Sequence, residues 1–191
     1  MRWLALLCLV ACGGSDSGTV DGAPGGGGSM SAKQFCVSET NRYRAMNGKA
    51  ALSESADLEA YADAGAMHDF TTSPHDHFST TSGGGIAFAE NECPQQGNWQ
   101  YTEGGDLNMV VGSCIAAFYS EGPGTDYNTH GHYINMMGNY ASLGCGIYYS
   151  GGKITIVQDY GNDLGTRARH GRAPRGRLAA DRVDPRPRRV E

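Results

Sequence analysis

The sequence predicts an α+β domain with an antiparallel sheet, because three helical patterns come first and a β-hairpin pattern comes last. The helical patterns begin near residues 31, 55 and 106, and apolar or small side chains recur in each at steps of three and four. The hairpin pattern covers 141–161, where alternating Ile, Tyr, Val and Thr residues are interrupted once, at Ser150-Gly151-Gly152. The stretch between the two chain ends, roughly 130 residues, suits one domain with one core.

Local signals set the expected ends of these elements. The first helix is expected to stop at the Asn-Gly pair 47–48, and the second to start after Ser55, a typical N-cap residue. Many small residues in the second helix indicate close packing against a neighbour. The third helix is expected to start near Asp106 and to stop at the Gly-Pro pair 122–123. Residues 71–85 are rich in Ser, Thr and Gly and are expected to form a loop.

The N-terminal residues resemble a bacterial lipoprotein signal. Arg2 precedes a short apolar run over 3–11, and the run ends in "LVAC". We expect residues 1–11 to be the signal peptide and Cys12 to carry lipid, which would anchor the protein to a membrane face. The alternative is an ordinary cleaved signal in which Cys12 has no such role. Residues 12–30 are dominated by Gly, Ser and Asp and are expected to form a flexible tether.

In an oxidising compartment outside the cytoplasm, the remaining cysteines are expected to form disulfides. We expect the protein to face the periplasm or the cell exterior, with the choice between inner and outer membrane left open. Cys36, Cys93, Cys114 and Cys145 then predict two disulfides, with three pairings open. A metal site made of all four thiolates is disfavoured because no C-x2-C pair is present.

The formal net charge of −5 hides two regions of opposite sign. Residues 164–191 hold nine Arg against three acidic residues, so the rest of the chain is strongly acidic. An acidic domain, expected over 31–163, argues against a nucleic-acid partner for the folded part. The Arg-rich tail is expected to be disordered, and it would either bind anionic surfaces or be an out-of-frame translation product.

Histidines and glutamates gather in the middle of the sequence. Five of the six histidines fall between residues 68 and 132, and Glu90, Glu92 and Glu121 lie in the same stretch; the histidines are His68, His75, His77, His130 and His132. In an extended chain, both members of an H-x-H pair share a face and could reach one ion. Zinc is bound by such imidazoles and carboxylates when they converge from separate segments. The alternative is that these histidines are solvated loop residues.

Four stretches together resemble the CAP superfamily of cysteine-rich secretory, antigen 5 and pathogenesis-related proteins. The similarity covers about residues 31–161, in the family's order. The stretches are "CVSETNRYRAMNGKAALSESADLEAYADAGA" for the opening helices, "AEN" for the family's "GEN", "VVGSCIAAFYSE" for the helix that ends in Trp-Tyr-x-Glu, and "GHYINMMGNYASLGCGIYYSGGKITIVQDYG" for the C-terminal half. The resemblance implies an α-β-α sandwich with a central antiparallel sheet and an open cleft.

The resemblance also implies a set of site residues. In the family, two His and two Glu face the cleft and sometimes bind zinc or another divalent ion. Matched by motif, these are Glu90, Glu121, His132 and, as the remaining histidine, His77, with His75 as its alternative. His130 would be a rim residue, an extra ligand or a chance member of its pair.

Two functions follow for such a cleft. The first is a lipid-anchored, monomeric module without clear catalysis that binds a divalent metal, a lipid or a small partner. The second is a zinc-dependent peptidase or esterase in which His77 and His132 hold zinc and Glu90 or Glu121 is the general base. A carrier of sterol or fatty acid is a third reading of the resemblance. Binding is favoured because the sequence contains no G-x-S-x-G or H-E-x-x-H motif.

Overall fold

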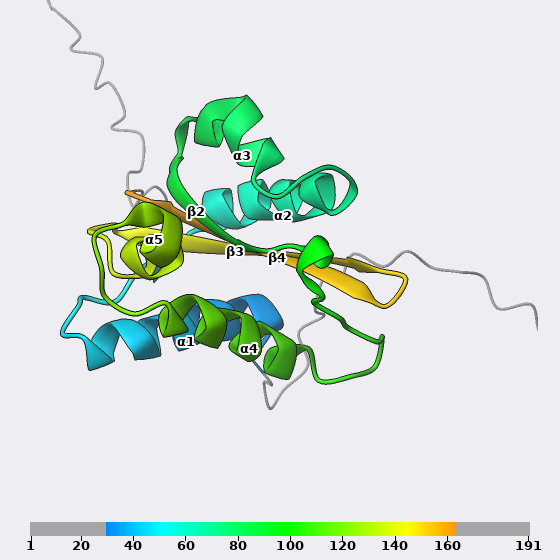
Figure 1. Cartoon of the computed structure of the whole chain (residues 1–191), viewed down its shortest axis with the longest axis horizontal. Coiled ribbons are helices and arrows are strands. Elements are labelled where there is room, and N and C mark those ends of the chain that lie inside the picture. The colour runs from blue at the N-terminus through cyan, green and yellow to red at the C-terminus, as the bar shows by residue number, and fades with distance from the viewer. Residues whose placement is uncertain (1–29, 163–191) are drawn as a thin grey trace, which may run out of the picture.

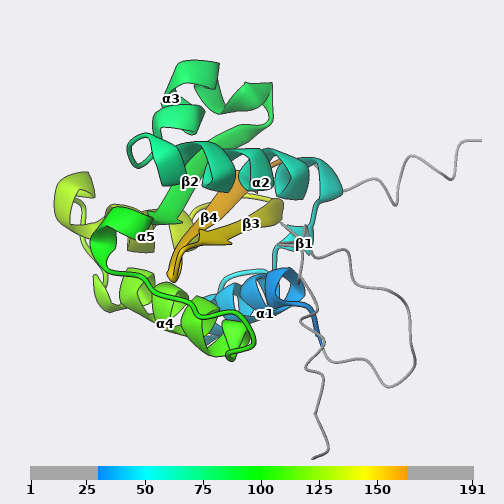
Figure 2. The same ribbon diagram turned by 90° about the vertical axis from the view of Figure 1, so that its right-hand side faces the viewer.

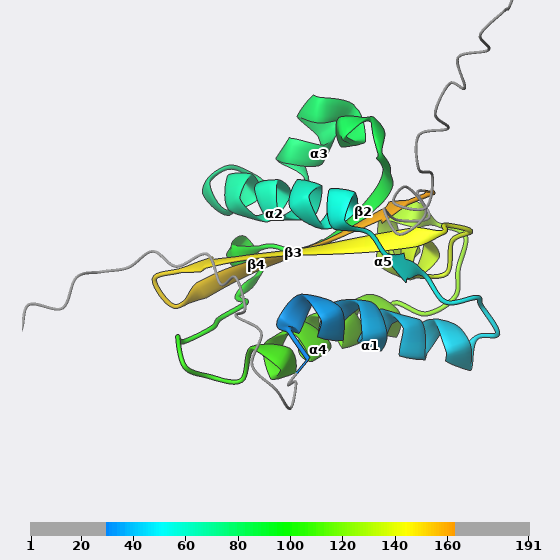
Figure 3. The ribbon, with the colours of Figure 1, turned by 180° about the vertical axis from the view of Figure 1, so that it is seen from behind.

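The computed structural model describes residues 30–162, which form three layers. Helices α2 and α3 lie on one face of a central sheet, and α1 and α4 lie on the other (Figures 1 and 2). Seen from behind, β3 runs between α1 and α2 (Figure 3). The α-β-α sandwich expected for a single domain is therefore confirmed. The expected signal (1–11), Cys12 and the Arg-rich tail (164–191) lie outside the described residues.

The sheet has four strands in the order β1-β3-β4-β2. The pairs β3–β4 and β4–β2 are antiparallel, while the two-residue strand β1 pairs parallel with β3. The elements are α1 (Ala32–Met46), β1 (Ser53–Glu54), α2 (Ala56–Thr71), α3 (Asp76–Thr81), the 3-10 turn η1 (Ser82–Gly85), β2 (Ala87–Cys93), the 3-10 turn η2 (Gln95–Gly97), α4 (Leu107–Ser120), α5 (Tyr127–Met136), β3 (Ser142–Ser150) and β4 (Lys153–Gly161). Strand β2 is an edge strand, and α5 lies beside it and next to α4 (Figure 2).

The three predicted helices and the hairpin are confirmed. Ser55 and Asp106 cap α2 and α4 with their side chains, as expected, and Asn47 ends α1. One prediction about the remaining segments is wrong, and the extended geometry considered for the H-x-H pairs does not apply. The stretch 71–85 contains the short helix α3, and both members of the second H-x-H pair lie in α5 rather than in an extended chain.

Helix α2 packs directly on β3 because two glycines remove the side chains that would separate them. A Cβ at Gly146 would lie 2.0 Å from the carbonyl oxygen of Ala62, and one at Gly144 would lie 2.2 Å from the carbonyl carbon of Leu58. Cys145, between these glycines, points to the opposite face. In the sequence "GCG", the two glycines therefore allow α2 to approach one face of the sheet, while the cysteine points to the α1 side.

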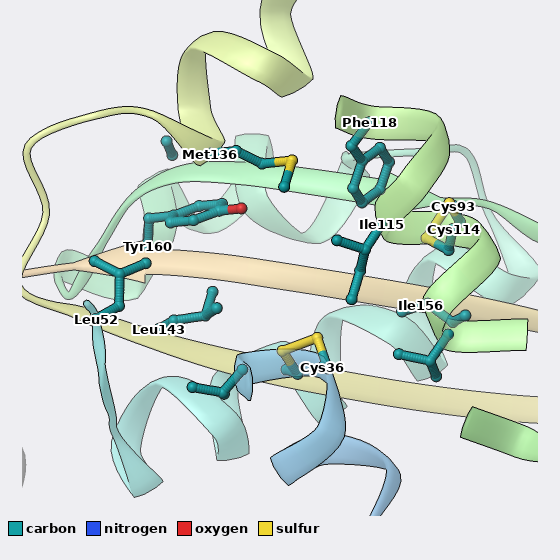
Figure 4. Close-up of a cluster of buried hydrophobic side chains, with 14 of the residues drawn as sticks. Cys36, Leu52, Cys93, Cys114, Ile115, Phe118, Met136, Leu143, Ile156 and Tyr160 are labelled. Atoms are coloured by element: carbon teal, nitrogen blue, oxygen red, sulfur yellow. A yellow bond between two sulfur atoms is a disulfide. The ribbon is translucent and has the colours of Figure 1, made fainter. Parts of the chain in front are cut away.

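Two disulfides join the layers on the α1–α4 side, and the structure selects one of the three pairings left open. Cys36–Cys145 ties α1 to β3, and Cys93–Cys114 ties the end of β2 to α4. Both lie in the main core, whose other buried side chains include Leu52, Ile115, Phe118, Met136, Leu143, Ile156 and Tyr160 (Figure 4).

Arg44 fixes the C-terminal end of α5 against α1. Its side chain is buried, and its guanidinium donates to the carbonyl oxygens of Ala50 (2.9 Å), Met136 (2.6 Å) and Gly138 (3.0 Å). The cation thus satisfies three backbone acceptors, including those that follow α5. Within residues 30–162, no helix combines the length and the apolar character needed to cross a bilayer.

Candidate metal centre

A cleft of about 400 Å³ opens between α3 and α5, with β2 along its floor. The cleft is lined by His75, Glu90, Glu121 and His132, together with Phe78, Phe88, Ala89, Tyr127, Asn128, Gly131 and Asn135. Two His–Glu pairs therefore reach one hollow from segments far apart in the sequence.

The first pair is His75 with Glu90. His75 precedes α3 in a left-handed conformation (φ 62°), and its Nδ1 lies 2.7 Å from Glu90 Oε1 on β2. The backbone N–H of His75 donates to Glu92 Oε2 at 2.7 Å. The bond to Glu90 raises the pKa of His75, and burial raises the pKa of Glu90. The imidazole stays partly exposed to the cleft while the Glu90 carboxylate is buried beneath it.

The second pair is His132 with Glu121. His132 Nδ1 lies 2.5 Å from Glu121 Oε1, and Glu121 Oε2 accepts from the backbone N–H groups of His132 (2.9 Å) and Tyr133 (3.3 Å). The imidazole stacks on Phe118, with 4.6 Å between ring centroids. Glu121 follows α4 directly, so one carboxylate fixes both the position of α5 and the ring of His132.

Each pair leaves the other imidazole nitrogen available. A carboxylate only accepts hydrogen bonds, so Nδ1 of each histidine carries the hydrogen and Nε2 of the neutral ring keeps its lone pair. Metal-binding histidines show this arrangement, in which a carboxylate holds one nitrogen and thereby orients the other. The donor set therefore fits a divalent ion that accepts imidazole nitrogen, such as zinc.

Two buried asparagines connect the two sides of the cleft. Asn91 Nδ2 donates to the carbonyl oxygen of His132 (3.1 Å), and Asn135 Nδ2 donates to the carbonyl oxygen of Glu90 and to Asn91 Oδ1 (3.0 Å each). These bonds tie strand β2, which carries Glu90, to helix α5, which carries His132. This arrangement gives the Asn of "AEN" a structural role beside its glutamate.

The expectation that His77 lines the cleft is not met, and its alternative His75 takes that place. His77 lies in the first turn of α3, where residues two apart point in different directions. Its backbone N–H donates to Asp69 Oδ1 (2.8 Å), and its ring lies against the rings of Tyr61 and His68.

His130 does not line the cleft either. Its Nδ1 bonds to the carbonyl oxygens of Glu121 (2.7 Å) and Gly122 (3.1 Å), so it closes the turn between α4 and α5. The two H-x-H pairs thus contribute one cleft residue each, because residues two apart at the start of a helix or within it point in different directions.

The sequence reasoning missed two members, Asp69 and Asp159, of a set of buried acidic residues behind His75. The ligand atoms of His75, Glu90 and Glu92 lie within 4.8 Å of one another, and Asp69 and Asp159 are fully buried nearby on α2 and β4. Burial raises the pKa of Asp159 to about 9 and that of Glu92 to about 7. Glu92 was already noted in the sequence, where it follows Glu90 by two residues, and in strand β2 it shares the face of Glu90.

Comparison with known proteins agrees with this architecture. A sequence model of the cysteine-rich secretory protein family (CAP) matches residues 37–160. A solved structure described as "Crystal structure of NaASP2 with Zn2+" superimposes with a TM-score of 0.50 at 20% identity, covering 74% of this chain and 84% of that chain. Identity at this level supports the shared fold alone. No curated protein matches the sequence.

Proposed function

Because this chain belongs to the cysteine-rich secretory protein (CAP) family, we propose that it is an exported binding module whose cleft holds a divalent metal ion, zinc in the first place. His75 and His132 would be the ligands, and Glu90 and Glu121 would orient them. The observation that carries the proposal is the pair of Nδ1–carboxylate contacts in one cleft, 2.7 Å and 2.5 Å long, which leave both Nε2 atoms for an ion.

A zinc-dependent hydrolase in the same cleft is the weaker alternative. It would need a carboxylate free to take a proton from water. Glu121 uses Oε1 on His132 and Oε2 on two backbone N–H groups, and Glu90 is buried with Oε1 on His75. Both carboxylates are thus engaged in holding structure, which favours binding over catalysis.

The rim of the cleft suits an apolar or amphipathic ligand beside the ion. Phe88 and Tyr127 line the cleft and are 61% and 58% exposed, which is high for large apolar side chains. A lipid or a small partner that offers an oxygen donor to the metal and an apolar part to these rings fits this combination.

Export and membrane anchoring complete the proposal. The two disulfides support an oxidising compartment outside the cytoplasm. Anchoring depends on Cys12. Replacing Cys12 by Ser is expected to move the protein from the membrane fraction to the soluble fraction, and unchanged partitioning of that variant would contradict the anchor.

Zinc titration calorimetry on the full chain tests the binding proposal. His75→Ala and His132→Ala should each raise the dissociation constant for zinc by about tenfold or more, because each removes a ligand. His77→Ala is the matched control and should stay close to wild type. Zinc-dependent turnover of peptide or ester panels, abolished by both ligand variants, would instead establish the hydrolase.

A further inference from the structure

Three side chains that can bind a metal converge where α2 ends and α3 begins. His68 and Asp69 lie in the last turn of α2, and Asp76 is the first residue of α3. One ligand atom from each residue lies within 4.8 Å of the other two, and His68 Nε2 lies 2.7 Å from Asp76 Oδ2. We call these three residues the α2–α3 cluster. None of them lines the cleft, so the cluster is separate from the two His–Glu pairs.

Asp69 supplies this cluster with a buried oxygen atom that has no partner. Its side chain is fully buried, and Oδ1 accepts from the backbone N–H of His77 at 2.8 Å. Within residues 30–162, Oδ2 has no hydrogen-bond partner, and no Lys or Arg forms an ion pair with the carboxylate. An unpaired buried acceptor is unfavourable, and more so when it is charged. Burial accordingly raises the pKa of Asp69, and a cation beside Oδ2 would stabilise the carboxylate.

The backbone that carries these ligands is held in place by side-chain donors. Thr71 Oγ1 and Thr72 Oγ1 both donate to the carbonyl oxygen of His68, at 3.0 Å each. Gln96 Nε2 donates to the carbonyl oxygens of Asp69 (3.4 Å) and Thr72 (3.2 Å). The end of α2 is therefore fixed before any ion arrives, which is what a metal site needs.

Helix α3 has few other attachments to the rest of the domain. None of its six residues is buried, and it lies above α2 in Figure 1, farther from the sheet. Asp69 holds the backbone N–H of His77 near its start, and the hydroxyl groups of Tyr61 and Thr81 lie 2.6 Å apart at its end. An ion bound by the α2–α3 cluster would cross-link the two helices at the start of α3.

We propose that the α2–α3 cluster is a second metal site, which binds a divalent ion of the zinc class through one imidazole and two carboxylates and clamps α3 to α2. Imidazole nitrogen favours zinc over Mg²⁺ and Ca²⁺, and zinc accepts carboxylate oxygen as well. The ion would take the place of the hydrogen between His68 and Asp76, and Asp69 would use Oδ2. The side chains of His68 and Asp76 are 42% and 35% exposed, so water can fill the remaining coordination positions.

Zinc titration calorimetry on the full chain, stripped of metal by chelation, counts the sites. Wild type should bind two zinc ions per chain, one in the cleft and one in the α2–α3 cluster. His68→Ala should raise the dissociation constant of the second site by about tenfold or more, because it removes a ligand, and should leave the cleft site unchanged. Asp57→Asn, which changes an exposed acid of α2, is the matched control and should keep both sites.

Hydrogen exchange tests the clamp itself. In His132→Ala, which weakens the cleft site, zinc should still slow amide exchange over residues 76–81 by about tenfold or more, because binding to the native state suppresses local opening. In the double variant His68→Ala/His132→Ala, zinc should not slow it.

The outcomes separate this site from the cleft. The proposal is overturned if His132→Ala and the double variant bind zinc equally, if His132→Ala alone abolishes all zinc binding, or if zinc leaves exchange over 76–81 unchanged. A wild type that binds no zinc overturns both proposals. A single zinc that depends on His68 and not on His132 supports this site and contradicts the cleft. Should His68→Ala fail the check of native circular dichroism, Asp76→Asn carries the same expectation.

Discussion

Replacing Gly146 by Ala tests the close contact on which the whole α2 layer depends. The added Cβ would lie 2.0 Å from the carbonyl oxygen of Ala62 and 2.1 Å from its carbonyl carbon, where ordinary contacts begin at 3.4 Å. Both obstacles are backbone atoms of a helix interior, so no side chain can turn away. Helix α2 would have to retreat by about 1.4 Å, which opens gaps around Ala62, Ala66 and Val157. We expect a loss of about 3 kcal/mol or more in the free energy of unfolding.

Urea denaturation with the disulfides intact measures this loss, and Gly112→Ala supplies the control. Gly112 lies inside α4, and its added Cβ would meet only the ring of Phe35 at 3.4 Å, so the higher helix propensity of Ala should leave stability equal or higher. In a domain of this size, the Gly146→Ala loss corresponds to about 10 °C in Tm. A Gly146→Ala protein within about 0.5 kcal/mol of wild type would refute the packing argument.

Two further stability predictions follow from the same core. Replacing both Cys36 and Cys145 by Ser should cost about 5 kcal/mol, and replacing Cys93 and Cys114 about 3 kcal/mol, because the first pair closes a loop of 109 residues and the second one of 21. Urea midpoints in the reverse order would contradict this reading. Arg44→Met should cost about 3 kcal/mol by leaving three carbonyl groups without their donor. A loss below about 1 kcal/mol in the same assay would show that water replaces the guanidinium.

The elements that the sequence predicts well are those with local signals. The side-chain cap at Ser55, the apolar spacing of α4 and the Gly151-Gly152 turn of the hairpin each act within a few residues. The recurrence of small residues at steps of three and four in α2 is a local signal of the same kind. Each of these signals can therefore be recognised from a short stretch of the sequence.

The helices α3 and α5 escaped prediction because their stability comes from elsewhere. Helix α3 has no buried residue and is held at its start by carboxylates of β2 and α2. Helix α5 buries only Asn135 and Met136, so its sequence lacks an apolar stripe. Without these helices, the H-x-H pairs look extended, and the choice of His75 over His77 cannot be made.

For a similar reason, the sequence predicts some of the residues around the site and not others. Glu90, Glu121 and His132 carry family motifs, so their positions could be matched from the sequence. In the sequence, Asp159 is only an acidic residue inside an apolar strand. Its position opposite Glu90 depends on the register between β2 and β4. Register between β2 and β4 is a tertiary property, which explains why the closeness of Asp159 to Glu90 became visible only with the structure.

The most direct test of the cleft is a crystal grown with zinc and measured at the zinc absorption edge. The account predicts one anomalous peak in the cleft, about 2.0–2.1 Å from Nε2 of both His75 and His132. A peak bound to His77 or His130 instead, or full-occupancy zinc elsewhere with an empty cleft, would contradict it.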